Sequence, residues 1–284
     1  MVIGELLQNA TGQLQNAGID NARLDAEVLL AHLLNRERLY LVTHRTDEIA
    51  ADIADAFRHL IVRRVKHEPV AYLIGQREFM SLDFSVCPGV LIPRPDTETL
   101  VELILETTPK QEPFTLLDLC TGSGAIAVSL AHYLPNSHVT AVDISDICVE
   151  TAKKNATRNG VAGRVQVLQA DILKPLPSLD LFDCVVSNPP YIPTKVLETL
   201  EADVQDFEPH TALDGGGDGL IFYRHIIQNA PAFLRKGGLL ALEIGHDQRD
   251  AVTHLMAESG FFTQVDIRRD LAGIDRVVFG RFKG

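Results

Sequence analysis

The sequence predicts an α/β protein with a doubly wound, mostly parallel sheet and a small helical domain ahead of it. From Phe114 onward, short apolar runs alternate with segments of helical periodicity. Such alternation is typical of parallel strands joined by helices that cover both faces of a sheet. The first 75 residues carry helical periodicity alone. A length of 284 residues suits one domain of ordinary size and a smaller one.

The expected elements of the sheet domain follow one another in a regular order. Strands are predicted at residues 116–120, 139–143, 165–169, 184–187, 239–244 and 277–281. Helices are predicted at residues 125–134, 148–159, 220–229 and 251–259. The last segment, residues 265–281, favours two strands joined by a loop. We therefore expect an antiparallel strand at the C-terminal end of the sheet.

The helical periodicity of the N-terminal segment has identifiable ends. One helix is predicted to begin after Asp20, a suitable cap, and to end near Asn35. A second helix is predicted from about Thr46 to Lys66, with Pro69 just past its end. We therefore expect residues 1–75 to form a separate helical domain.

A change of pattern separates this domain from the sheet. Residues 78–86 partly alternate apolar and polar side chains, as a β-hairpin does. Pro88, Pro93 and Pro95 then stiffen an irregular connection. We expect residues 76–95 to be a β-hairpin linker and residues 96–284 to be the sheet domain.

Charge and cysteine usage argue against several classes of protein. The formal net charge of -12 disfavours a protein that holds nucleic acid through its phosphates, because such proteins usually present a basic face. The four cysteines are widely separated and lack zinc-site spacing. No secretory signal and no long apolar run is present. We expect free thiols, no metal ion, no membrane contact and a cytoplasmic location.

A glycine-rich turn after the first predicted strand marks the nucleotide-binding half of a Rossmann-like sheet. Gly122 and Gly124 permit tight backbone geometry and close approach of a ligand to the main chain. Asp118, beside this turn, would repel a pyrophosphate but suits the cationic amino and sulfonium groups of S-adenosylmethionine. We therefore favour S-adenosylmethionine over a dinucleotide.

Acidic residues also follow the next two predicted strands. Asp143 is placed to accept hydrogen bonds from both ribose hydroxyls. Asp171 could meet the adenine through a polar contact and Ile172 through an apolar one. Each aspartate could instead cap the following helix or turn. Three acids at successive strand ends favour a ligand site, because such sheets bind ligands at the carboxyl ends of their strands.

The tetrapeptide Asn188-Pro189-Pro190-Tyr191 follows the fourth predicted strand and is the candidate catalytic site. The prolines lack N–H donors, so the main chain offers carbonyls. The Asn188 side chain and the Pro189 carbonyl can accept both hydrogens of an sp² NH₂ group, while the Tyr191 ring packs on its plane. This arrangement would turn the nitrogen lone pair toward a methyl donor. A simple turn is the alternative, since Asn-Pro is common in turns.

This chemistry implies a planar nitrogen acceptor, in either a nucleobase or an amide. An enzyme acting on nucleic acid would need a basic groove and a way to extrude the base, which the acidic composition disfavours. A non-catalytic cofactor-binding protein is the alternative from another class. The intact tetrapeptide and glycine-rich turn count against it.

Several further segments resemble the release-factor glutamine methyltransferases, the PrmC or HemK family. Besides the tetrapeptide, these segments are residues 77–79, 91–98, 207–209, 216–220 and 270–276. With the helical N-terminal domain, the resemblance covers essentially the whole chain. It implies a Rossmann-like methyltransferase sheet, S-adenosyl-L-methionine as the cofactor and S-adenosyl-L-homocysteine as its product.

The resemblance also implies an acceptor, the side-chain amide nitrogen of the glutamine in the GGQ motif of class-one peptide chain release factors. Methylation there would modulate translation termination. A release factor is then the protein partner, docked by residues 1–75, with a monomeric enzyme and no direct nucleic-acid binding. A ribosomal-protein glutamine or a nucleic-acid amino group is the alternative acceptor.

The family pattern also assigns site residues. It places Cys120, Thr121, Gly122, Ser123, Gly124, Asp143, Ile172 and Asn188 at the cofactor, and Asn188, Pro189, Pro190 and Tyr191 at the glutamine. Most members have glycine where Cys120 stands. We expect cofactor binding to survive, because the cysteine side chain is small.

Overall fold

The computed structural model describes residues 1–109, 111–176 and 180–284, which form two compact units. The first unit comprises Met1–Gln76 and the short segment Glu201–Phe207. The second comprises Arg77–Leu200 and Glu208–Gly284. The hairpin that we expected as a linker therefore groups with the second unit. Residues 201–207, which we expected in the sheet domain, group with the first.

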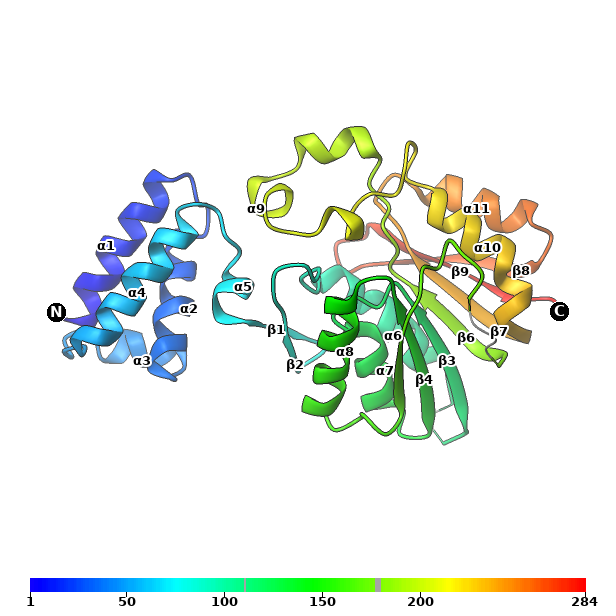
Figure 1. The fold of residues 1–284 in the computed structure, drawn as a ribbon, viewed down its shortest axis with the longest axis horizontal. Coiled ribbons are helices and arrows are strands. Elements are labelled where there is room, and N and C mark those ends of the chain that lie inside the picture. The colour runs from blue at the N-terminus through cyan, green and yellow to red at the C-terminus, as the bar shows by residue number, and fades with distance from the viewer. Residues whose placement is uncertain (110, 177–179) are drawn as a thin grey trace. The chain divides into compact units, whose positions relative to one another are not determined.

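The first unit is a bundle of short helices (Figure 1). Its helices are α1 (Ile3–Asn16), α2 (Ala22–Leu34), α3 (Arg38–Thr43), α4 (Ala51–Arg64), α5 (Val70–Ile74) and α9 (Ala202–Gln205). Leu14, Leu29 and Phe57 are buried in its core. Helix α2 ends as predicted at Asn35, which takes a left-handed φ of 51° that asparagine tolerates well.

The predicted start of the second helix at Thr46 was wrong. Helix α4 begins at Ala51, because the residues before it pair with the N-terminus of the chain. Glu48 forms an antiparallel bridge with Val2, and the Ile49 N–H donates to the Met1 carbonyl over 3.0 Å. This tertiary pairing overrides a helical pattern that would otherwise continue upstream.

A buried arginine holds the segment 201–207 within the first unit. Arg64 is 7% exposed, and its guanidinium donates from Nε to Asp25 and from Nη1 to Asp203, each over 2.8 Å. The His67 ring lies 3.2 Å from the second oxygen of Asp203. Asp203 is thus anchored by two side chains of the first unit.

The second unit contains the predicted sheet, now seen to have seven strands (Figure 1). The strands are β3 (Phe114–Leu119), β4 (Ser137–Asp143), β5 (Val165–Gln169), β6 (Phe182–Ser187), β7 (Leu234–Glu243), β8 (Phe262–Arg269) and β9 (Asp275–Phe282). Their order is β5-β4-β3-β6-β7-β9-β8. The first five pair in parallel, and β9 is antiparallel to both neighbours. The doubly wound sheet and its antiparallel C-terminal end are both confirmed.

Helices cover both faces of this sheet. Helices α6 (Glu98–Thr107), α7 (Ala125–Tyr133) and α8 (Asp146–Arg158) contribute to one buried apolar cluster. Helices α10 (Ile221–Phe233) and α11 (Arg249–Glu258) contribute to the other. Because side chains alternate along a strand, Leu116 enters the first cluster and Leu117 the second. The hairpin β1 (Gln76–Phe79) and β2 (Leu82–Ser85) closes the first cluster.

The strand order creates a switch point beside β3. The chain runs from β3 outward to β4 and β5, then returns to place β6 on the other side of β3. Leu119, the last residue of β3, lies opposite Ser187, the last residue of β6. The glycine-rich turn and the tetrapeptide therefore leave neighbouring strands at the same edge, where such sheets bind ligands. None of the helices in the described ranges is long and apolar enough to cross a membrane.

Candidate active site

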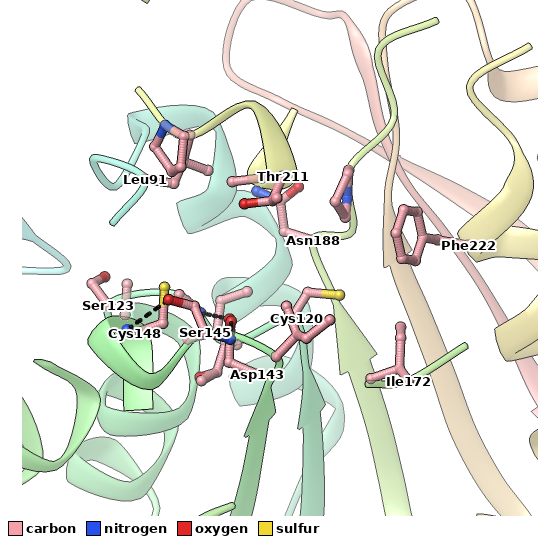
Figure 2. Close-up of a pocket in the computed structure, with 18 of the residues that line it drawn as sticks. Leu91, Cys120, Ser123, Asp143, Ser145, Cys148, Ile172, Asn188, Thr211 and Phe222 are labelled. Atoms are coloured by element: carbon pink, nitrogen blue, oxygen red, sulfur yellow. Dashed lines mark hydrogen bonds between the residues drawn. The ribbon is translucent and has the colours of Figure 1, made fainter. Parts of the chain in front are cut away.

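A cavity of about 370 Å³ opens at this edge of the sheet. Nine of the predicted site residues line it: Cys120, Thr121, Gly122, Ser123, Asp143, Asp171, Ile172, Asn188 and Pro190. Figure 2 shows Cys120, Asp143 and Asn188 around the same space, although they come from three different strands. Gly124, Pro189 and Tyr191 are not among the lining residues but are adjacent in the chain to residues that are.

The glycine-rich turn uses backbone conformations that few side chains adopt. Gly122 has φ 56° and Gly124 has φ 80°, both in the left-handed region. A Cβ atom on Gly124 would lie 3.0 Å from the Cβ of Ala152, so α7 and α8 approach closely here. Cys120 also has a positive φ, 62°, which costs a non-glycine residue some conformational strain. This explains in physical terms why glycine is suited to position 120.

Asp118 supports the turn from behind and does not line the cavity. Its side chain is fully buried, and Oδ2 accepts hydrogen bonds from the Thr121 hydroxyl at 2.6 Å and the Ala127 N–H at 3.2 Å. Burial raises the pKa of this carboxyl to about 7. We expected Asp118 to face the cofactor cation; instead it fixes the conformation of the turn.

Asp143 joins the turn to the next strand. Its Oδ2 accepts from the Gly122 N–H at 2.8 Å, and its Oδ1 accepts from the Ser145 N–H at 3.0 Å. Burial raises the pKa of this carboxyl, and these backbone donors oppose the rise. Each carboxylate oxygen has a second acceptor position, so two vicinal hydroxyls can still bind.

The next strand end offers a polar and an apolar side chain. Asp171 accepts from the Leu173 N–H at 3.0 Å and lies 3.1 Å from the Lys174 ammonium. The hydrogen bond from Lys174 is the main cause that lowers the pKa of Asp171. Ile172 is 6% exposed and lines the cavity. These side chains suit S-adenosylmethionine, because the Asp143 carboxylate can accept from ribose hydroxyls and Ile172 offers an apolar surface to the flat base.

Asn188 is held at the cavity by a residue from the proline-rich segment. Its Nδ2 donates a 3.1 Å hydrogen bond to Oγ1 of Thr97, at the end of the 3₁₀ helix η1 (Pro95–Thr97). Both residues line the cavity. The carbonyl oxygen of the Asn188 amide is therefore the atom available to a ligand on the side away from Thr97.

The end of the tetrapeptide is held by the side chain of Gln248. Gln248 Nε2 donates to the Tyr191 carbonyl at 2.9 Å and to the Gly219 carbonyl at 3.2 Å. Its Oε1 accepts from the Gly245 N–H at 3.0 Å and from the Tyr223 hydroxyl at 3.3 Å. Gln248 is 7% exposed, so all four bonds are shielded from water. Together they fix the backbone at Tyr191.

Close packing against the tetrapeptide requires glycine at two positions of the following loop. A Cβ on Gly215 would lie 2.8 Å from the Tyr191 Cα, and one on Gly219 would lie 2.4 Å from the Tyr191 carbonyl oxygen. In contrast, a Cβ on Gly217 would meet nothing within 4 Å. The loop is therefore packed onto Tyr191 at both ends.

The two residues that hold the tetrapeptide from outside it, Thr97 and Gln248, escaped the sequence prediction, as did Glu243 at the end of β7. Thr97 lies in the segment 91–98, which we quoted for its resemblance but interpreted largely as a linker. Glu243 and Gln248 follow the apolar run of β7 and have no motif spacing. Among the residues that the structure describes, no group of three His, Cys, Asp or Glu side chains could hold a metal ion.

Comparison with known proteins gives the same assignment for the whole chain. The family model for the PrmC N-terminal domain matches residues 5–75, and that for the methyltransferase small domain matches residues 94–207. A release factor glutamine methyltransferase from Moorella thermoacetica is 48% identical over 97% of both chains. The enzyme of the same name from Clostridium botulinum is 40% identical over 99% of both chains. The one from Geobacter sulfurreducens is 43% identical over 98% of this chain and 96% of the relative.

Solved structures support the fold. The catalytic domain of hMettl16 superposes with a TM-score of 0.59 at 15% identity, covering 88% of this chain and 90% of that one. A methyltransferase from Pyrococcus furiosus superposes with a TM-score of 0.51 at 19% identity, covering 72% of this chain and 91% of the other. With its full-length relatives, its two matched domains and this fold, the chain belongs to the release factor glutamine methyltransferases and is an S-adenosylmethionine-dependent enzyme.

Proposed function

We propose that the enzyme methylates the side-chain amide nitrogen of the glutamine in the GGQ motif of class-one peptide chain release factors. Methylation at this position would modulate translation termination. The names of the relatives support a release factor as the substrate. The observation that carries the proposal is the fixed Asn188 amide, which lines the cavity beside the glycine-rich turn.

Bound S-adenosylmethionine would supply an electrophilic methyl group at this edge of the sheet. Asp143 would accept hydrogen bonds from its ribose hydroxyls, and the turn from Cys120 to Gly124 would run along its amino-acid part. Asp143 and residues 120–123 of the turn line the same cavity as Asn188. The acceptor nitrogen and the methyl group would therefore meet in a single space.

The tetrapeptide would orient an acceptor that is a poor nucleophile. An amide nitrogen has a delocalised lone pair, so it reacts only when its geometry is controlled. The Asn188 side-chain carbonyl and the Pro189 main-chain carbonyl would accept its two hydrogens, with Tyr191 beside its plane. Holding both hydrogens turns the lone pair toward the methyl group and stabilises the charge that develops on nitrogen.

Protein rather than nucleic acid is the acceptor that the composition favours. The chain carries a formal net charge of -12, and polyanion binding depends on neutralising phosphates with cations. We further propose that the N-terminal unit docks the release factor and that the enzyme acts as a monomer. Ribosomal protein and DNA are the competing acceptors that an assay must include.

The test supplies tritiated S-adenosylmethionine with unmethylated release factor, ribosomes and DNA in parallel. We expect label in the release factor, and none in a release factor whose GGQ glutamine is replaced by alanine. Greater label in ribosomal protein or DNA would reject the proposal. Asn188→Ala should abolish transfer while cofactor affinity changes little, whereas the exposed matched control Asn229→Ala should retain full activity.

A further inference from the structure

The proposed function requires one particular orientation of the Asn188 amide. A planar amide can be turned over so that its oxygen and nitrogen exchange places. Only one orientation presents the oxygen to an acceptor NH₂ group. The other presents a second NH₂ group and repels it. The groups behind Asn188 therefore decide whether the site can work.

Thr97 contacts the nitrogen side of this amide. Its hydroxyl accepts the 3.1 Å hydrogen bond from Asn188 Nδ2, and its side chain is only 5% exposed. A hydroxyl can both accept and donate, so Thr97 alone could serve either orientation of the amide. To fix the orientation of the Asn188 amide, a third group must accept a hydrogen bond from the Thr97 hydroxyl.

Glu243 lies where such a group is needed. It is the last residue of β7, and the preceding pair in the parallel register joins Leu242 to Ser187, directly before Asn188. Its side chain is 2% exposed. Burial raises the pKa of its carboxyl, and hydrogen bonding from the Thr97 and Asn188 side chains opposes that rise. Yet its Oε2 has no hydrogen-bond partner of normal geometry within the described part of the chain.

We propose that Glu243 and Thr97 are positioning residues that set the orientation of the Asn188 amide. The Glu243 carboxylate accepts a hydrogen bond from the Thr97 hydroxyl. The hydroxyl proton is then engaged, so toward Asn188 the hydroxyl oxygen can only accept. The Asn188 NH₂ group must then face Thr97 and Glu243, and its oxygen faces the acceptor. This inference rests on the proposed role of Asn188 and adds two residues outside the tetrapeptide.

The charge state of Glu243 should therefore control the amide. Burial raises the pKa of its carboxyl to about 7. The other charged groups that act on it are Arg276 of β9, which lowers the pKa, and Asp96 of η1, which raises it. Burial raises the pKa of the Tyr191 and Tyr223 phenols, and the nearby Glu243 charge adds to that rise.

Protonated Glu243 would reverse the chain of hydrogen bonds. As a carboxylic acid it donates to Thr97, whose own proton then points at Asn188 and favours the reversed amide. We expect kcat of the wild type to rise with pH through about 7, following loss of one proton. In Glu243→Gln this dependence should disappear, while the exposed matched control Glu150→Gln should keep it.

The experiment compares Thr97→Val, Thr97→Ser, Glu243→Gln and Glu150→Gln in kcat, KM for release factor and Kd for S-adenosylmethionine. Thr97→Val and Glu243→Gln should lower kcat by about tenfold to a hundredfold, the range for losing a group that orients another side chain of the site. Cofactor Kd should change by less than about threefold, and Thr97→Ser should restore most of kcat. Circular dichroism confirms that each variant is folded.

Three results would overturn the inference. They are unchanged kcat in Thr97→Val and Glu243→Gln, equal loss in Thr97→Ser and Thr97→Val, or an unaltered pH profile in Glu243→Gln. Failure of the proposed function is separate, because it would appear as wild-type inactivity on release factor. In that event, hydrogen exchange of the ¹⁵N-labelled Asn188 side-chain amide tests its contact with Thr97. Slow exchange in wild type and Thr97→Ser but fast exchange in Thr97→Val supports the contact. Equal rates in all three proteins reject it.

Discussion

Replacement of Gln248 by methionine tests whether this buried amide holds the catalytic backbone. Methionine has a similar length and shape but forms none of the four hydrogen bonds. It would leave the carbonyls of Tyr191 and Gly219, the Gly245 N–H and the Tyr223 hydroxyl without this partner. The Tyr223 hydroxyl keeps its 2.8 Å hydrogen bond to the Glu243 carbonyl, so at a net value of about 1 kcal/mol for each of the other three bonds the loss is about 3 kcal/mol. A buried apolar side chain recovers about 1 kcal/mol, so we expect about 2 kcal/mol of destabilisation.

Urea denaturation followed by circular dichroism measures this change in the free energy of unfolding of the sheet domain. The matched control is Gln166→Met, because Gln166 is exposed on β5 and its replacement should cost less than about 0.5 kcal/mol. We also expect kcat to fall more than KM rises, since the tetrapeptide loses its fixed geometry. Equal stability of Gln248→Met and Gln166→Met would refute the reasoning.

Three further predictions concern the turn and the loop. Cys120→Gly should change cofactor Kd by less than about threefold, whereas Cys120→Val should cost about 2 kcal/mol in thermal unfolding, because φ at this position is 62°. Gly219→Ala should lower methyl transfer by at least about tenfold, since its Cβ would lie 2.4 Å from the Tyr191 carbonyl oxygen; Gly217→Ala, with nothing within 4 Å, should be active. The stability of Asp118→Asn relative to the wild type should rise between about pH 4 and 7. The pKa of the folded carboxyl is about 7 and that of the unfolded chain is lower, so the wild type loses stability across this range and the variant does not. A pH-independent difference in urea midpoint would contradict this last expectation.

The sheet was predictable because its strands are short apolar runs with clear ends. The predicted and observed limits of β5, Val165–Gln169, coincide. Strand β7 begins five residues earlier than predicted, at Leu234 and not at residue 239. Arg235 and Lys236 are exposed there, and the register with β6 shifts near Phe182, so no apolar pattern marks this part of the strand.

Helix α6, Glu98–Thr107, was not predicted. Its residues Leu100, Val101, Leu103 and Ile104 are buried, while Glu102 and Glu106 are exposed, so a helical pattern was present in the sequence and was missed. Its start directly after the proline-rich segment also suggested an irregular connection. Because this segment was interpreted as a connection, Thr97, which sits at the start of α6, was overlooked as well.

The tetrapeptide was predictable from the sequence, whereas the groups that hold it in place were not. Residues that follow one strand end, such as the tetrapeptide, form a visible motif because consecutive positions must face one ligand. The groups behind them need only be near in space. Asn188 and Thr97 are separated by 91 residues, and Gln248 lies 57 residues after Tyr191. A single threonine, glutamate or glutamine at such separations carries no spacing signal.

Tertiary structure supplies these groups through the same switch point that creates the cavity. Strand β6 lies between β3 and β7, so the tetrapeptide at its end has the glycine-rich turn on one side and Glu243 on the other. The first neighbour brings the cavity that suits the methyl donor, and the second brings the carboxylate behind the Asn188 amide. A tetrapeptide placed at the end of an edge strand would have only one of these neighbours. Its chemistry therefore depends on a central position in the sheet as much as on its own four residues.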